Sequence, residues 1–398
     1  MMHKMNPAES DFALEEMPGE EMHRLLRDLR SRGPIGRARF MGIPAFIITG
    51  HQALLAAFMD AEKFPPHRLY QASFEGAIGE SFISMEDPRR HLLYRRLATP
   101  AFRSQAVSRY EREDLEALAH ELIDRLEGQE QFDLVEAFTS RFPYLVISRL
   151  LGLPRDREDD FQEWAAALLA FRDNPDRAAI ARQRLTEFLI PAVDERRQNP
   201  RDDVISELLR ARVDGRQLSD EEIYSHIRLL FPTGGETTHG SLGNLLSSVL
   251  GSPGLWPSLA EDPSQIPDVV RESLRWETPI AVLPRISASF DMEFEGVHIP
   301  ADSWTLFAIA AANRDPDLFP NPDRFDPSRF RTETRGDESL TFGRGTKACP
   351  GMHLARKNME VAFRVLLERL PNLELIDHEA ALPRRTVLRC PDALRVRR

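Results

Sequence analysis

Two cysteines occur in the chain, and one of them lies in a setting suited to metal chemistry. Cys349 follows a loop that contains Gly343 and Gly345, which permit a tight and unusual backbone path. It precedes Pro350, a residue favoured at the first position of a helix. Backbone N–H groups and the macrodipole at a helix start stabilise a thiolate, the form of cysteine that binds a soft metal. The glycines also give N–H groups access to the sulfur, which tunes a bound metal.

A buried structural cysteine is the alternative interpretation, because free cysteines are among the most buried residues in proteins. The glycines, the proline and the helix start favour the ligand role for Cys349. Cys390 lies in a strand-like Leu-Arg-Cys-Pro segment without these features, and we interpret it as structural. The segment 343–347 does not match a phosphate-binding loop, which has four residues between its first glycine and its Gly-Lys pair.

A second candidate site interrupts a long helical pattern. Pro232 removes one backbone donor and crowds the preceding turn, which predicts a kink. Gly234 and Gly235 each cost about 1 kcal/mol relative to alanine inside a helix. We expect the weakened turn to leave room for a small ligand beside Glu236 and Thr237, an acid and an alcohol that together could relay protons. A plain helix bend with a solvated glutamate is the alternative.

Helices are expected to position both groups of residues. Apolar residues recur at helical spacing in most of the chain, and Ser219 with Glu222 has the spacing of a capping box. The predicted helices cover 18–32, 111–126, 160–170, 219–250, 267–276 and 350–370. Alternating patterns predict a strand pair over 40–49 and a hairpin over 292–307, and residues 313–330 are expected to be irregular. We therefore predict one mainly α domain with small β-sheets over residues 1–398, with 1–34 as its N-terminal arm and first helix.

The composition excludes several classes of function. The net charge of −11 and pI of about 5.6 argue against nucleic-acid binding, which needs a clustered basic excess. No run of eighteen apolar residues predicts a membrane anchor, and residues 1–10 lack the apolar core of a signal peptide. With two cysteines in 398 residues, a disulfide framework is excluded and a reducing cytoplasm is expected.

The segment 342–351 resembles the haem-binding loop of the cytochrome P450 family, whose pattern is Phe-Gly-x-Gly-x-[His/Arg]-x-Cys-x-Gly. The match is complete except that Lys347 stands where histidine or arginine is usual. The segment 233–238 resembles the family's [Ala/Gly]-Gly-x-[Asp/Glu]-Thr-Thr signature, with Thr233 replacing the small first residue. These resemblances imply the cytochrome P450 fold and haem b as cofactor. They also imply that Cys349 is the iron ligand, whose electron donation favours O–O cleavage.

The family resemblance assigns roles to further residues. Glu236 and Thr237 would be catalytic, delivering protons to dioxygen bound at the iron. Glu272 and Arg275 resemble the family's Glu-x-x-Arg pair, with Arg324 of the Pro-Asp-Arg-Phe segment as the third member of a structural lock. The residues that would bind the cofactor, mostly through its propionates, are His91, Arg95, Arg285 and Lys347, with Gly343 and Gly351 of the cysteine loop. A lysine at 347 offers a point charge where arginine offers a fork, so we expect a looser propionate contact there.

The implied activity is hydroxylation of a hydrophobic small molecule of terpenoid, steroid or fatty-acid type. The protein would use O2 and electrons from a ferredoxin and an NAD(P)H-driven ferredoxin reductase, and would act as a cytoplasmic monomer without a membrane anchor. A peroxide-driven enzyme is an alternative, which the pair Glu236–Thr237 disfavours because the family's peroxide users lack it. A haem-binding sensor or carrier without turnover is another.

We also expect a surface that binds the redox partner and a pocket that binds the substrate. A local basic patch would steer an acidic ferredoxin to the cysteine side of the molecule. Its expected members are Arg89, Arg90, Arg95, Arg96, Arg103, Arg344, Lys347, Arg356 and Lys357. The substrate pocket should be apolar. By family position its walls are 64–82, 164–171, 229–233, 280–283 and 388–391.

Overall fold

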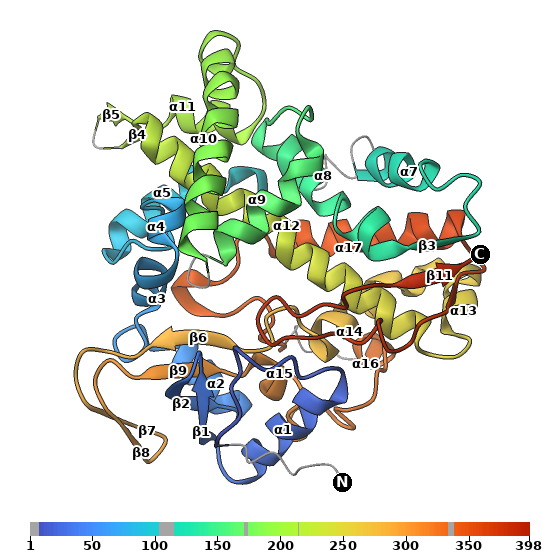
Figure 1. The fold of residues 1–398 in the computed structure, drawn as a ribbon. Helices are drawn as coiled ribbons and strands as arrows, with labels where there is room; N and C mark the ends of the chain where they lie inside the picture. The colour runs from blue at the N-terminus through green and yellow to red at the C-terminus, as the bar shows by residue number, and fades with distance from the viewer. Residues whose placement is uncertain (1–7, 103–114, 171–173, 214, 333–337) are drawn as a thin grey trace.

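The computed structural model describes residues 8–102, 115–170, 174–213, 215–332 and 338–398. Figure 1 shows the arrangement of the described residues, in which helices dominate and the strands form small separate sheets. The predicted fold class, mainly α with small β-sheets, is confirmed. Within these ranges, no helix is both long enough and apolar enough to cross a membrane.

The helices are, in chain order, α1 (Glu20–Ser31), α2 (His51–Met59), α3 (Pro66–Ser73), α4 (Glu75–Ile78), α5 (Pro88–Ala98), α7 (Glu116–Asp124), α8 (Phe142–Leu151), α9 (Phe161–Leu169), α10 (Pro175–Gln198), α11 (Val204–Arg210), α12 (Asp220–Leu250), α13 (Leu255–Glu261), α14 (Ile266–Trp276), α15 (Ile309–Ala312), α16 (Arg329–Thr332) and α17 (Met352–Arg369). The strands are β1 (Ile35–Phe40), β2 (Ile43–Ile48), β3 (Gln131–Asp133), β4 (Arg212–Val213), β5 (Arg216–Gln217), β6 (Leu283–Ile286), β7 (Met292–Phe294), β8 (Val297–Ile299), β9 (Trp304–Phe307), β10 (Glu374–Leu375) and β11 (Arg395–Arg397).

The largest sheet has the strand order β1-β2-β9-β6 and lies at the lower left of Figure 1. The strand pair predicted over 40–49 is present but begins earlier, at Ile35. The hairpin predicted over 292–307 forms only between β7 and β8, where Glu295 and Gly296 both have positive φ, as a two-residue turn requires. The last part of that segment, β9, pairs instead with β2 and β6.

The central element is α12, which passes through the middle of the molecule (Figure 1) and contacts α8, α9, α14 and α17. The predicted capping box at its start is confirmed, since Ser219 and Glu222 exchange hydrogen bonds. The helix predicted over 219–250 is confirmed, and α12 runs as one helix through Pro232. The kink at this residue stays a prediction. A proline inside a helix costs about 3 kcal/mol. The packing of neighbouring helices around α12, where Phe231 and Pro232 are buried, offsets this cost.

Other predicted helix boundaries differ by a few residues. The helix predicted over 160–170 is α9, which begins at Phe161, and the one predicted over 267–276 is α14, which begins at Ile266. In the helix predicted over 111–126, residues 111–114 lie outside the described residues, and α7 covers Glu116–Asp124. The irregular segment 313–330 is largely confirmed, with α16 starting at its end.

The buried pair Glu272 and Arg275 locks α14 to the irregular segment. Both side chains are 0% exposed and form two hydrogen bonds of 2.7 Å. The expectation that Arg324 completes this lock is wrong, because its side chain is exposed and only its carbonyl oxygen accepts from Arg275. The third arginine is Arg329 in α16, whose Nε lies 3.2 and 3.3 Å from the two carboxylate oxygens of Glu272.

We predict that Arg329→Ala lowers the free energy of unfolding by about 2 kcal/mol, the value of a hydrogen bond to a charged group. Arg324→Ala is the matched control, and we expect it to change this free energy by less than about 0.5 kcal/mol because the side chain is exposed. Urea unfolding with linear extrapolation measures both variants. Equal losses in the two variants would contradict the assignment of Arg329.

A second buried carboxylate joins the two ends of the chain. Glu277, just after α14, contacts His23 of α1 at 3.0 Å and accepts a hydrogen bond of 2.6 Å from Arg389. Arg389 is fully buried and also donates to the carbonyl oxygens of Met17 and Gly19. The neighbouring cations more than offset burial and hold the pKa of Glu277 well below its usual range. This contact fixes the N-terminal arm against the C-terminal turn.

Candidate functional site

The loop before Cys349 has the unusual backbone path that its glycines predict. Gly343 and Gly345 adopt φ values of 65° and 74°, a region that residues with a Cβ rarely occupy. A Cβ at Gly345 would lie 2.7 Å from the carbonyl oxygen of Phe58. The backbone N–H of Cys349 donates to the carbonyl oxygen of Phe342 at 2.8 Å and closes the loop.

The position of Cys349 relative to the helix differs from the prediction. Helix α17 begins at Met352 with Gly351 as its N-cap, so Pro350 precedes the helix and is not its first residue. The carbonyl oxygen of Gly351 still accepts the first backbone hydrogen bond of the helix, from Ala355 at 2.8 Å. The expected contact of a glycine N–H with the sulfur is present, because the Gly351 backbone hydrogen-bonds to the thiol.

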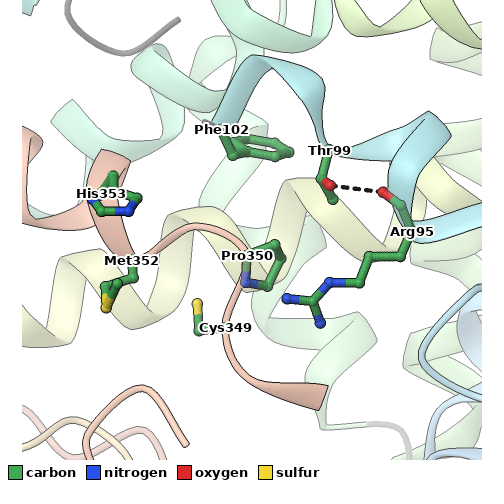
Figure 2. Close-up of a pocket in the computed structure, with 7 residues that line it drawn as sticks. All are labelled: Arg95, Thr99, Phe102, Cys349, Pro350, Met352 and His353. Carbon is green, nitrogen blue, oxygen red and sulfur yellow. Dashed lines mark hydrogen bonds between the residues drawn. The ribbon is translucent and has the colours of Figure 1, made fainter. Parts of the chain in front are cut away.

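Cys349 lines a cavity of about 390 Å³ with Arg95, Thr99, Phe102, Pro350, Met352 and His353. Figure 2 shows Arg95 extending from α5 toward the segment that carries Cys349 and Pro350. Cys349 is exposed to this cavity, and partial removal of its thiol from water by the surrounding walls raises the thiol pKa more than the Gly351 N–H and the Arg95 charge lower it. A bound metal would add positive charge that favours the thiolate form of Cys349.

Three of the predicted cofactor residues meet at the cysteine loop. Arg95 donates to the carbonyl oxygens of Thr346 and Ala348, and His91 Nε2 lies 3.1 Å from the Thr346 oxygen. Lys347 Nζ lies 2.9 Å from His91 Nδ1. The same ammonium donates to the backbone carbonyl oxygens of Phe82 at 2.9 Å, Ile83 at 2.9 Å and Met85 at 3.3 Å.

Arg285 reaches the same region from β6. It is buried and lines a cavity of about 20 Å³ together with Lys347, Thr346 and Arg344. Its guanidinium donates to the carbonyl oxygen of Pro284 and lies 5.6 Å from the ring centroid of Phe307. Burial and the positive charges of Arg95 and Arg285 lower the pKa of Lys347 from 10.5 to about 7.

The cluster formed by Arg95, Lys347 and Arg285, hereafter the cation cluster, lacks negative charge. Among the residues that the structure describes, no carboxylate forms an ion pair with any of its three members. Buried cations are normally paired or hydrogen-bonded to anions. A dianionic ligand beside the thiol would satisfy the cluster. Haem fits this donor set, because it combines a metal that accepts a thiolate with two propionates that accept from cations.

Glu236 and Thr237 lie on α12 and belong to a different cluster of polar groups. The Thr237 hydroxyl donates to the carbonyl oxygen of Thr233 at 2.7 Å, and Glu236 Oε2 accepts from the phenol of Tyr144 in α8. The glycines beside them lie against α8. A Cβ at Gly235 would lie 2.2 Å from Tyr144, and one at Gly234 would lie 3.0 Å from Ile147, so both glycines admit α8.

The Gly235→Ala variant tests whether packing against Tyr144 or helix propensity determines the effect of this residue on stability. Propensity alone would raise the free energy of unfolding by about 1 kcal/mol. We predict instead a loss of about 2 kcal/mol, because the new methyl group overlaps the Tyr144 ring in a buried contact. Gly234→Ala is the control, with a smaller expected effect because its Cβ meets the flexible end of Ile147. Thermal and urea unfolding measure both, and a stabilised Gly235→Ala variant would contradict the packing explanation.

The predicted basic patch is partly neutralised. Arg89 and Arg96 are exposed on α5, but Arg90 pairs with Glu80 at 2.8 Å and Lys357 pairs with Glu360 at 3.0 Å. Arg356 lies over the Phe342 ring, 5.3 Å from its centroid. Arg103 lies outside the described residues. The exposed positive charge on the cysteine side is therefore concentrated on α5.

A family model described as "Cytochrome P450" matches residues 12–262 and 265–383. The chain belongs to the cytochrome P450 family. Curated relatives include cytochrome P450 107B1 of Saccharopolyspora erythraea, which is 32% identical over 92% of this chain and 91% of its own length. The 6-deoxyerythronolide B hydroxylase of the same organism is 33% identical over 92% of this chain and 93% of its own length.

Solved structures of cytochromes P450 share the fold over almost the whole chain. Cytochrome P450 CYP109Q5 from Chondromyces apiculatus matches with a TM-score of 0.85 and 29% identity, covering 98% of both chains. The myxobacterial cytochrome P450 CYP267B1 in complex with myristic acid matches with a TM-score of 0.85 and 28% identity, covering 95% of this chain and 96% of that one. Relatives are named as hydroxylases, so this chain is a cytochrome P450 monooxygenase with a haem-iron cofactor.

Sequence reasoning missed two residues that contact predicted ones, Arg329 beside Glu272 and Tyr144 beside Glu236. The segment 324–330 contains two Arg-Phe pairs, so the second pair could have pointed to Arg329 as well as Arg324. No sequence signal pointed to Tyr144, because its partner Glu236 lies 92 positions away on another helix. The adjacent glycines of α12 were the available sign that a large side chain approaches there.

Proposed function

We propose that this P450 uses O2 and electrons from a ferredoxin to hydroxylate a hydrophobic small molecule at a Cys349-ligated haem b. The observation that carries the proposal is the cation cluster beside a thiol, in which one buried and two half-buried basic side chains have no carboxylate partner among the described residues. Residues 1–398 would act as one haem-binding unit and as a monomer, with 1–34 as its N-terminal arm.

The residues that would hold haem come from α5, β6 and the cysteine loop. Cys349 would supply the thiolate, and the haem iron supplies redox chemistry when it is bound. Arg95, His91 and Arg285 would donate to the propionates. Lys347 would add a fourth donor, although its ammonium already donates to carbonyl oxygens of the 82–85 segment. The backbones of Gly343 and Gly351 would let the loop approach the cofactor closely.

Glu236 and Thr237 of α12 would hold and pass protons for the reaction. In the structure the Thr237 hydroxyl is held by the Thr233 carbonyl oxygen, one turn earlier on α12. A hydroxyl in this position can rotate to donate elsewhere while it keeps its place on the helix. Glu236 is half-buried, so its carboxylate can exchange protons with solvent and with groups inside the protein.

The proposed substrate is hydrophobic, of the terpenoid, steroid, polyketide or fatty-acid type. Ala281 and Val282, between α14 and β6, are fully buried and carry no charge. Relatives include an erythromycin C-12 hydroxylase, and a similar solved structure contains myristic acid. Of the expected walls, Trp164 packs in the core against Phe161 and Phe188, and Phe171 lies outside the described residues.

Two other functions remain as outcomes of the test. A peroxide-driven enzyme would turn over faster with peroxide than with reductase and ferredoxin, and the presence of Glu236 beside Thr237 argues against it. A sensor or carrier would bind haem and show no substrate-dependent NADPH consumption. A ligand library screened by the haem Soret shift would first identify the compound class.

The test of the function is NADPH consumption with reconstituted reductase and ferredoxin, coupled to an oxygenated product. We predict that Thr237→Ala keeps the fold and consumes NADPH, but diverts several-fold more reducing equivalents to peroxide because the proton-donating hydroxyl is lost. Cys349→Ala is the control without the thiolate, which should lose the carbon monoxide spectrum of a thiolate-ligated ferrous haem. Unchanged coupling in Thr237→Ala would count against its role.

We propose that an acidic ferredoxin docks on the cysteine side, over α5, and that the protein acts in the cytoplasm. Arg89 and Arg96 are exposed there, and Arg95 connects the same helix to the backbone of the cysteine loop. The support is electrostatic, since a local positive patch on a protein of net charge −11 attracts an acidic partner.

Charge reversal tests this surface. We predict that Arg89→Glu with Arg96→Glu lowers the electron-transfer rate at low salt by about tenfold or more, with a smaller difference at high salt because ions screen the interaction. Arg184→Glu, on the exposed face of α10, is the control and should leave the rate unchanged. Stopped-flow reduction by ferredoxin measures the rate, and identical rates in both variants would exclude this docking surface.

A further inference from the structure

Helix α12 receives two hydrogen bonds of the same kind, each from a buried tyrosine to a glutamate. The phenol of Tyr94 in α5 donates to Glu222 in the first turn of α12. The phenol of Tyr144 in α8 donates to Glu236, fourteen residues further along the helix. Glu222 also takes part in the capping box and pairs with Arg216. Glu236 has no ion-pair partner among the described residues, so the Tyr144 phenol is its main fixed contact.

The position of Tyr144 is fixed by close packing. Its side chain is 1% exposed and lies against Phe231, with ring centroids 5.7 Å apart. The ring approaches the α12 backbone so closely that only glycine fits at 235, one residue before the glutamate. The phenol oxygen therefore has little freedom to move relative to the carboxylate.

The chemistry of the pair gives each partner a defined role. Burial, and then the Glu236 charge, raise the pKa of the Tyr144 phenol well above 10, so it keeps its proton and acts as a donor. Two further titratable groups interact electrostatically with Glu236. They are His239, one turn further along α12, and Cys390 in the C-terminal turn. Arg385 donates to the Cys390 sulfur at 3.2 Å.

We propose that Tyr144 is a positioning residue that holds the Glu236 carboxylate at the point from which it passes protons. The inference rests on the proposed function, because it assigns a partner to the acid of the acid–alcohol pair. Glu236 takes a proton from water and releases it toward the Thr237 side, while Tyr144 keeps its own proton throughout. Without the phenol, the carboxylate can adopt several rotamers, and only some of them place it for proton transfer.

The functional experiment compares Tyr144→Phe with Tyr94→Phe in the holoenzyme. Each variant removes one buried phenol hydroxyl that donates to a glutamate of α12, so general effects on stability are matched. We expect Tyr144→Phe to lower substrate-dependent NADPH consumption at saturating ferredoxin by about tenfold, the size of one hydrogen bond to a charged group. The solvent deuterium isotope effect should rise as proton delivery becomes limiting. Tyr94→Phe should stay within about twofold of the parent protein.

The double variant Tyr144→Phe with Glu236→Gln tests whether the two residues act together. Once Glu236 is replaced, removal of the phenol should have no further effect on the rate or the isotope effect, because coupled residues are not additive. Equal rates and isotope effects for Tyr144→Phe and Tyr94→Phe, or full additivity in the double variant, would overturn the proposal.

A second readout does not depend on turnover. The chain has five tyrosines, so Cζ-labelled tyrosine NMR of the carbon monoxide complex, which is diamagnetic, can resolve each phenol. The Tyr144 signal, assigned by its loss in Tyr144→Phe, should shift in Glu236→Gln, whereas the Tyr94 signal should not. An unshifted Tyr144 signal would overturn the proposal. Absence of NADPH consumption in the parent protein, with the NMR shift present, would instead count against the proposed function.

Discussion

Positive charge without a matching negative charge is the constraint on which the candidate site depends. Arg95, Lys347 and Arg285 come from a helix, a loop and a strand that lie far apart in the sequence. Gathering one buried and two half-buried cations is unfavourable unless an anion joins them. Burial, and then repulsion by Arg95 and Arg285, lower the pKa of Lys347. The positive charge next to Cys349 is therefore unbalanced among the described residues, and a metal-bound dianion would balance it while adding charge that favours the thiolate.

The residues of the site could be predicted from sequence where local backbone geometry decides their role. The glycines at 343 and 345 need positive φ, and this need is readable from the sequence as a motif around Cys349. The capping box at Ser219 is equally local. The same reasoning failed where distant packing decides. Arg324 and Arg329 are each followed by a phenylalanine in the sequence. Only the placement of α16 against α14 brings the Arg329 side chain to Glu272.

Opposing effects explain the remaining differences between expectation and structure. A helix start favours a thiolate at Cys349, but burial is the larger effect and raises the pKa of the thiol. Pro232 weakens α12, but the helices packed around it hold the segment in helical form. In each case the sequence reveals the local preference, whereas the outcome depends on which elements surround the residue. Those surroundings are a property of the assembled fold.

The contact between Tyr144 and Gly235 also limits how this chain can change over evolutionary time. Any side chain at 235 would overlap the ring, so the glycine cannot be replaced while a tyrosine occupies 144. A smaller residue at 144 would have to appear first, and that change removes the hydrogen bond to Glu236. The two positions, 91 residues apart in the sequence, are therefore expected to vary together among homologues, with the loss of one permitting the loss of the other.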